Sequence, residues 1–149
     1  MPATKFRTKV SANSGLVADE LFTAAIDLSN RQYYFVVPSS SPGEVTAATG
    51  ASNPTPFGVL QNAPTASQLA RVRVFGRTQL ATSPNACNIG YGRFVTANAC
   101  GAGIAAIDSA CSVLARWLSA SQASGTPASG YAFVNCIAFS GSALGGAAS

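Results

Sequence analysis

Histidine is absent from this sequence of 149 residues, and only five carboxylate side chains are present. Without an imidazole, the chain cannot assemble the Ser-His-Asp or Cys-His arrangements of many hydrolases. Paired-carboxylate catalysis needs two acids that face each other across a cleft. Asp19 and Glu20 are neighbours and would point to opposite faces of a strand. Nothing in the sequence brings Asp27, Glu44 or Asp108 together. We therefore expect no catalytic residues and a protein that is not an enzyme.

Motifs for metals and nucleotides are missing as well. The cysteines stand at long, irregular spacings without a C-x-x-C pair: Cys87, Cys100, Cys111 and Cys136. Structural zinc sites normally need close Cys/His pairs. No G-x-G-x-x-G or Walker sequence occurs, and Gly90-Tyr91-Gly92 predicts a tight turn. We expect no metal and no cofactor, and we interpret the cysteines as small buried or half-buried side chains, with one disulfide as the main alternative.

Charge is scarce. Charged residues make up 9% of the chain and the formal net charge is +4, whereas soluble domains average about 25% charged residues. The chain has no run of Lys and Arg, which argues against a nucleic-acid partner. It also has no run of 18 apolar residues and no apolar signal-peptide region after Met1–Val10. These features predict a protein made in a cytoplasm, without a membrane partner, and with much of its surface against other protein.

What the sequence does contain is a period of two. Short segments rich in β-branched and aromatic residues alternate with Gly, Pro, Asn and Ser, which predicts about nine strands in an all-β sandwich or barrel. The expected strands are Leu21–Ile26, Gln32–Val37, Glu44–Ala47, Pro56–Leu60, Ala70–Leu80, Arg93–Ala97, Ile104–Ile107, Cys111–Leu118 and Tyr131–Phe139. A helix is the alternative for residues 110–123, where several apolar residues also fit a helical face.

Composition divides the chain into three parts. Residues 16–139 form a single β domain, since a chain of this length favours one domain. Residues 1–15 are polar and basic, and they predict a flexible N-terminal arm whose cations Lys5, Arg7 and Lys9 contact a partner. Residues 140–149 are Gly, Ser and Ala for the most part, which predicts a flexible C-terminal tail.

The most informative segment runs from Ala70 to Arg77. Strand alternation places Ala70, Val72 and Val74 on one face. The opposite face carries an arginine stripe about 20 Å long, and its members are Arg71, Arg73, Phe75 and Arg77. Such a stripe is either a solvated outer face or a docking face for an acidic protein surface, because guanidinium groups fork onto carboxylates. Nucleic acid is a third and weaker interpretation, because single-strand binders usually interleave several aromatic residues with the basic ones.

Several blocks of the sequence resemble the capsid decoration (cement) proteins of tailed bacteriophages. The most specific is Gly58-Val59-Leu60-Gln61-Asn62-Ala63-Pro64. The other blocks are Asp27–Val36, Ala70–Arg77, Gly92–Thr96, Val113–Leu118 and Tyr131–Phe139. The resemblance implies a structural virion protein that binds the outer surface of a phage capsid and stabilises the shell. It also implies production in the host bacterial cytoplasm, the major capsid protein as partner, and contacts between copies, with a trimer favoured over a dimer.

The main alternative is a fibre-like or adhesive virion protein, or a carbohydrate-binding β domain. Sugar sites usually set a Trp or Tyr beside carboxylates or amides. Trp117 has only Asp108 as a nearby acid in the sequence, so this alternative has weaker support than the capsid role.

Overall fold

The computed structural model of the protein describes residues 16–48, 56–83, 88–106, 113–121 and 129–136. Over these residues the chain forms nine strands and no helix, so none of them belongs to a helix long and apolar enough to cross a membrane. The strands are β1 (Ala18–Ala24), β2 (Phe35–Pro38), β3 (Glu44–Ala47), β4 (Gly58–Leu60), β5 (Leu69–Ala81), β6 (Phe94–Ala97), β7 (Gly103–Ala105), β8 (Ala115–Trp117) and β9 (Ser129–Asn135).

The predicted all-β class is confirmed, and each expected strand has a counterpart. The second expected strand begins three residues too early, at Gln32 rather than Phe35. The backbone of Tyr33 has a φ of 67°, a left-handed conformation that a strand does not allow. The amide of Tyr34 instead donates to the carbonyl of Arg31 at 3.0 Å, which closes a turn before β2. The described part of segment 110–123 is extended at β8 and contains no helix.

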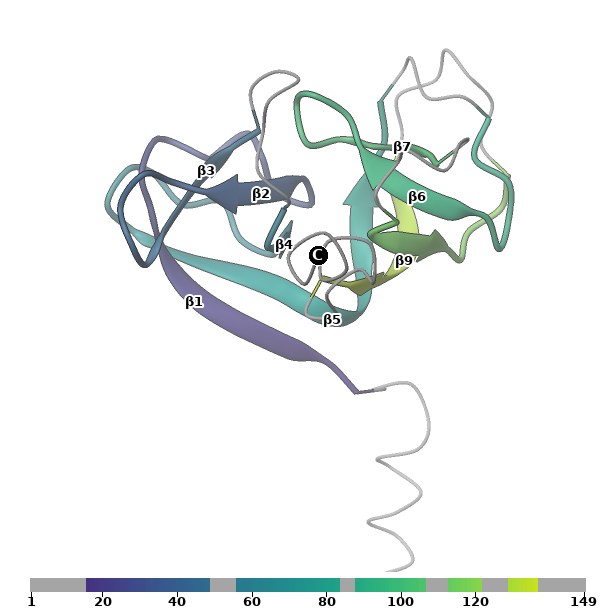
Figure 1. Cartoon of the computed structure of the whole chain (residues 1–149), viewed down its shortest axis with the longest axis horizontal. Coiled ribbons are helices and arrows are strands. Elements are labelled where there is room, and N and C mark those ends of the chain that lie inside the picture. Colours follow the sequence, from purple (N-terminus) through teal and green to yellow (C-terminus); the bar gives the residue numbers. More distant parts are fainter. Residues whose placement is uncertain (1–15, 49–55, 84–87, 107–112, 122–128, 137–149) are drawn as a thin grey trace, which may run out of the picture.

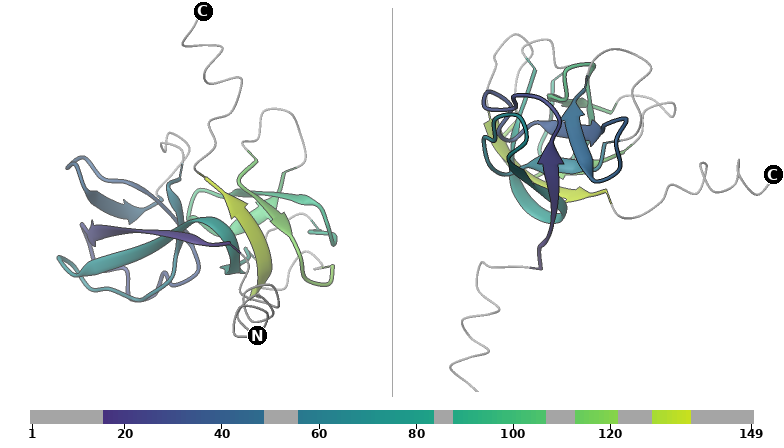
Figure 2. Two further views of the ribbon diagram at one scale, coloured as in Figure 1. Left: turned by 90° about the horizontal axis from the view of Figure 1, so that it is seen from below. Right: turned by 90° about the vertical axis from the view of Figure 1, so that its left-hand side faces the viewer.

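Five of the strands close into a barrel, in the order β1-β3-β2-β4-β5, because β1 pairs with both β3 and β5. The other four extend the sheet from β5 in the order β9-β8-β6-β7. Figure 1 shows the barrel strands at the left and β6, β7 and β9 at the right. The left-hand view in Figure 2, which looks at the molecule from below, shows the same two parts side by side, with β5 passing from one to the other.

Each part has its own hydrophobic core. The barrel encloses Leu28, Val36, Val45, Leu60 and Val72, all at or near zero exposure. The second core lies under the extension, and its members include Phe35, Leu80, Ile89, Val95, Trp117 and Val134. Strand β5 contributes to both, because its 13 residues alternate between buried and more exposed positions from end to end.

The barrel requires a glycine at the start of β4. A Cβ atom at Gly58 would overlap with the carbonyl oxygen of Arg73 and with the side chain of Val72. Val59 pairs with Arg73 and Leu60 with Val72, so β4 lies tightly against β5 at this point. The glycine of the Gly-Val-Leu-Gln block is therefore explained by the close approach of two backbones.

We expect Gly58→Ala to lower the free energy of unfolding by about 2 kcal/mol or more, because the added methyl group forces β4 away from β5. Gly90→Ala is the matched control, since a Cβ there meets side chains and no backbone: the flexible side chain of Arg93 at 3.2 Å and Ser121 Oγ at 3.9 Å. This substitution should change stability by less than about 0.5 kcal/mol. Chemical denaturation of both variants measures the difference. Equal denaturation midpoints for the two variants would show that β4 can shift away from β5 without a loss of stability.

Candidate docking surface

The structure confirms the orientation of the arginine stripe. Ala70, Val72 and Val74 are buried, while the alternate positions of β5 face outward. Gly76 has a φ of 111°, yet the alternation continues through it and leaves Arg77 on the outer face. The predicted arm residues Lys5, Arg7 and Lys9 lie outside the described residues.

Arg73 is bound within the chain itself. Its Nε and Nη2 donate to the two carboxylate oxygens of Asp19 at 2.7 and 3.0 Å, and its Nη1 donates to the carbonyl of Arg77 at 2.8 Å. Asp19 reaches this position because β1 pairs with β5, which sets Asp19 opposite Arg73. The side chains of Arg73 and Asp19 are only 19% and 22% exposed. This arginine therefore holds β1 on β5 and is less accessible to a partner than the sequence suggested.

The rest of the stripe is more open. The side chain of Arg71 is 54% exposed, and its Nε lies 3.7 Å from Asp19 Oδ2. Phe75 makes an edge-to-face contact with Phe133 of β9, with ring centroids 5.1 Å apart. Arg77 is exposed and its guanidinium lies 4.6 Å from the ring centroid of Tyr131. The end of the stripe at Phe75 and Arg77 thus contacts aromatic residues of the neighbouring strand β9.

These contacts extend the stripe into a larger surface, which we call the aromatic–arginine face. It consists of Phe75 and Arg77 from β5, Tyr131 and Phe133 from β9, Arg116 from β8, and Phe94 from β6. Its outermost aromatic rings, those of Phe94, Tyr131 and Phe133, are 38% to 47% exposed. Large apolar side chains exposed together on one face are typical of protein interaction sites.

Four members of the face form a row across the sheet. Phe94 pairs in register with Arg116. Arg116 pairs with Phe133, and Phe133 pairs with Arg77. Residues paired across neighbouring strands share a face and lie in contact. The guanidinium of Arg116 accordingly sits 5.0 Å from the ring centroid of Phe94. Cationic and aromatic side chains therefore alternate along the row.

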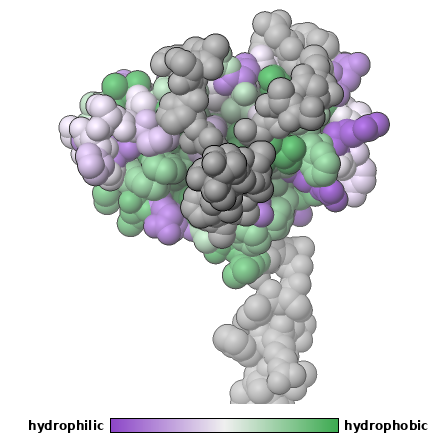
Figure 3. Space-filling model, in the orientation of Figure 1, coloured by the Kyte–Doolittle hydropathy of each residue, from purple (hydrophilic) through white to green (hydrophobic). Residues whose placement is uncertain are grey.

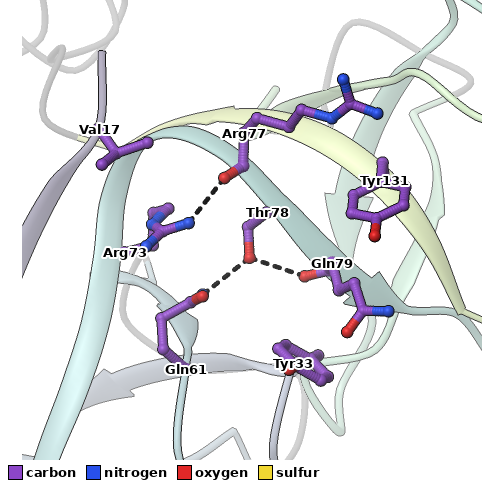
Figure 4. A pocket seen from close by; sticks show the side chains of 8 residues that line it. All are labelled: Val17, Tyr33, Gln61, Arg73, Arg77, Thr78, Gln79 and Tyr131. Atoms are coloured by element: carbon purple, nitrogen blue, oxygen red, sulfur yellow. Dashed lines mark hydrogen bonds between the residues drawn. The ribbon is translucent and has the colours of Figure 1, made fainter. Parts of the chain in front are cut away.

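An open groove of about 700 Å³ borders this face between Arg77, Tyr131 and Tyr33. Gln61 Nε2 donates to Thr78 Oγ1 at 2.7 Å (Figure 4), and it also donates to the Val59 carbonyl at 3.0 Å. The bond to Thr78 ties the end of β4 to the part of β5 beyond the barrel. Gln61, the polar residue of the Gly-Val-Leu-Gln block, thus has a structural role at the junction of the two parts.

A second group of exposed apolar residues lies along β1 and the neighbouring end of β5. Leu16, Leu21 and Leu69 are exposed, and Leu21 and Leu69 belong to β1 and β5. Figure 3 shows hydrophobic atoms on the lower side of the molecule, over β1 and beside its start. The outer surface of these two strands therefore carries exposed leucines beside the ion pairs of Asp19 with Arg71 and Arg73.

The structure also bears on three other features of the sequence: the possible sugar site at Trp117, the metal-ligating residues and the turn at residues 90–92. Trp117 is 1% exposed and its Nε1 donates to the carbonyl of Ala120 at 2.9 Å, so its ring cannot stack on a sugar. No cluster of metal-ligating side chains occurs among the described residues. Gly90-Tyr91-Gly92 forms the predicted tight turn, with the amide of Arg93 donating to the carbonyl of Gly90 at 3.0 Å.

The cysteine interpretation is correct for one described residue and wrong for another. Cys136 is half-buried and Cys100 is exposed, and both are free thiols. Cys100 is exposed because it lies at the tip of the β6–β7 turn, where its amide donates to Asn98 Oδ1 at 2.9 Å. Burial raises the pKa of Cys136 to about 12. Cys87 and Cys111 lie outside the described residues.

The sequence reasoning missed Phe94, Arg116, Tyr131 and Phe133 as surface residues. The signal was the spacing in β9, where Tyr131 and Phe133 alternate with Gly130, Ala132 and Val134. Hydrophobicity alone assigns the larger aromatic side chains to the core. A Cβ at Gly130 would overlap with the ring of Trp117, so the small residues face inward and the aromatic ones outward.

Comparison with known proteins identifies the fold. No protein-family model matches the sequence, and no curated protein matches it. Two solved phage structures are similar. The head fiber gp8.5 N base of bacteriophage phi29 has a TM-score of 0.55 and 13% identity, covering 84% of this chain and 99% of that chain. A chain in the capsid of Myoviridae phage XM1 has a TM-score of 0.57 and 14% identity, covering 85% of this chain and 88% of that chain.

The chain therefore has a fold that also occurs in a phage head fiber base and in a chain of a phage capsid. That agrees with the family resemblance found in the sequence. The resemblance and the fold were reached from different observations, since the first depends on short blocks of residues and the second on backbone geometry.

The ion pair predicts different effects for two neighbouring arginines. We expect Arg73→Ala to lower the free energy of unfolding by about 1–2 kcal/mol, because a partly buried, bidentate pair and a bond to a carbonyl are lost. Arg71→Ala should cost less than about 0.5 kcal/mol, since exposed ion pairs contribute little. Urea denaturation measures both. Equal effects would contradict a special role for Arg73.

Thiol labelling tests the environment of the two described cysteines. In the native protein at pH 8, iodoacetamide should modify Cys100 while Cys136 stays unmodified, because only the thiolate reacts and the pKa of Cys136 is about 12. Peptide mass spectrometry locates the modification, and labelling in urea provides the control in which both react. Rapid native modification of Cys136 would contradict its burial.

Proposed function

We propose that this chain is a structural virion protein that binds the outer surface of a phage capsid and stabilises the shell. Its partner is the major capsid protein. The observation that carries the proposal is the fold, which is shared with a phage head fiber base and a chain of a phage capsid. The exposed aromatic–arginine face supports it, because this fold presents there a surface suited to contact with protein.

The physics of a capsid favours such a protein. A shell offers many identical sites, so each copy can bind with modest affinity while neighbouring copies in contact add avidity. The low charge content, 9% of residues, suits a surface that is covered by other protein. Copies of the chain contact one another on the shell, as a trimer in preference to a dimer, and the protein is made in the host cytoplasm before it binds.

The basic segment before residue 16 adds a second contact. Lys5, Arg7 and Lys9 give it three cations and no acid. Ordering this segment on an acidic part of the shell would extend the interface, at an entropic cost incurred on binding. The arginine stripe, with Arg71 and Arg77 exposed, provides cations of the same sign on the folded part.

A head-fiber base is a second candidate function. The specific observation in its favour is that the similarity spans 99% of the phi29 head fiber N base. In that case the chain attaches to a capsid and anchors a further protein that projects outward. Both functions require capsid binding, and they differ in whether another protein joins the chain on its outer side.

Binding to shells assembled without this protein tests the proposal. We expect the purified full-length chain to co-sediment with such shells and to raise the temperature at which they disassemble, measured by light scattering. A chain lacking residues 2–12 should bind more weakly but melt at the same temperature as the full-length protein. Shells of an unrelated phage serve as the control.

Failure of the full-length chain to co-sediment at micromolar concentration would contradict both functions. Binding without a change in shell stability would favour the fiber-base function over the stabilising one. Equal binding of the truncated chain would remove the segment before residue 16 from the interface.

A further inference from the structure

Two guanidinium groups on the aromatic–arginine face lie over aromatic rings. Arg116 lies 5.0 Å from the ring centroid of Phe94. Arg77 lies 4.6 Å from that of Tyr131. A guanidinium over a ring keeps its N–H groups directed outward in the plane of the fork, where a carboxylate can accept two of them. Because stacking restricts the side chain beforehand, less conformational entropy is lost on binding.

Among the described residues, neither of these arginines has an ion pair with a carboxylate. The strands β5, β6, β8 and β9 contain no Asp or Glu. The ion pairs among the described residues involve Arg71 and Arg73 with Asp19 of β1. The face therefore presents two cationic groups among exposed apolar rings, and a ligand that matches it must supply the carboxylates.

Net charge distinguishes the two candidate binding partners of this face, a second copy of the chain and an acidic surface of a different protein. A second copy of this chain has a net charge of +4 and five carboxylates in 149 residues, and Asp19 is already bound to Arg73. Two such copies would bring like charges together, which weakens association. An acidic surface of a different protein fits the face better.

Register also sets how far apart the backbones of the two arginines lie in the sheet. Arg116 and Arg77 both pair with Phe133, on opposite sides of it. They are therefore two strands apart, about 10 Å at the usual strand separation. Phe133 lies between them and is 38% exposed. A complementary surface carries one carboxylate for each of the two arginines, with an apolar side chain between the carboxylates that packs on Phe133.

We propose that the aromatic–arginine face is the docking surface for the capsid, and that it recognises an acidic patch of the shell protein with this arrangement. Arg77 and Arg116 each bind a carboxylate through the fork of their guanidinium groups, and Phe133 provides the apolar contact between them. This inference rests on the proposed function and specifies which part of the chain performs it.

Shell binding by paired variants tests the inference. The double variant Arg77→Ala/Arg116→Ala should bind shells lacking the protein at least about tenfold more weakly than wild type, as expected when central Arg contacts are removed. The variant Arg77→Lys/Arg116→Lys should show an intermediate affinity, because Lys keeps the charge but not the planar fork. Wild-type binding should weaken as salt is raised.

Arg31→Ala is the matched control. Arg31 also lies over an aromatic ring, 5.3 Å from the centroid of Tyr34, but it is outside the face. It should bind shells like wild type, and thermal melting should show all variants folded.

The outcomes separate the two proposals. If wild type binds and the double alanine variant binds equally well, the face is not the docking surface, although the proposed function stands. If the lysine variant binds shells as tightly as wild type, the shell recognises only the positive charge, and the position of the guanidinium groups over the rings does not contribute to binding. If wild type does not bind at all, the proposed function itself fails.

Discussion

The whole architecture depends on one long strand that serves two cores. Strand β5 keeps its alternation over 13 residues, so that its inward residues fill the barrel at one end and the core of the extension at the other. Pairing with β1 and β4 completes the barrel, and pairing with β9 begins the extension. Because the two cores share a strand, the outward residues of β5 lie on a surface that crosses from one part to the other.

That shared strand also explains why the arginines of the stripe differ in role. Near the barrel, β1 brings Asp19 against Arg73, and a bidentate pair ties the two strands together. Beyond Phe75 the neighbour is β9, which supplies aromatic rings instead of an acid. Arg77 consequently lies over the ring of Tyr131 and is exposed. The same residue type is structural at one end of the strand and suited to binding at the other.

The filling of the second core decides what the outer surface looks like. Trp117 occupies the interior with its indole N–H bonded to Ala120. Its ring leaves room for no side chain at Gly130. Strand β9 must therefore turn its small residues inward, and Tyr131 and Phe133 face solvent beside the arginines. An apolar and cationic face on a chain with few charges is the consequence.

The sequence by itself determined the all-β class, the number of strands and the outward direction of the arginine stripe. These follow from local rules, because alternation and turn residues act within a few positions of one another. The strand ends were less certain, since the left-handed backbone at Tyr33 depends on its contacts with Leu60 and Ala81.

Only the tertiary structure decided the closure of the barrel, the pairing of Arg73 with Asp19, and the outward direction of the aromatic residues in β9. Asp19 and Arg73 are 54 residues apart in the chain. Strand alternation shows that Tyr131 and Phe133 share a face but does not show which face is buried. That choice depends on the volume of Trp117, a residue of another strand, and a local pattern contains no information about such a contact.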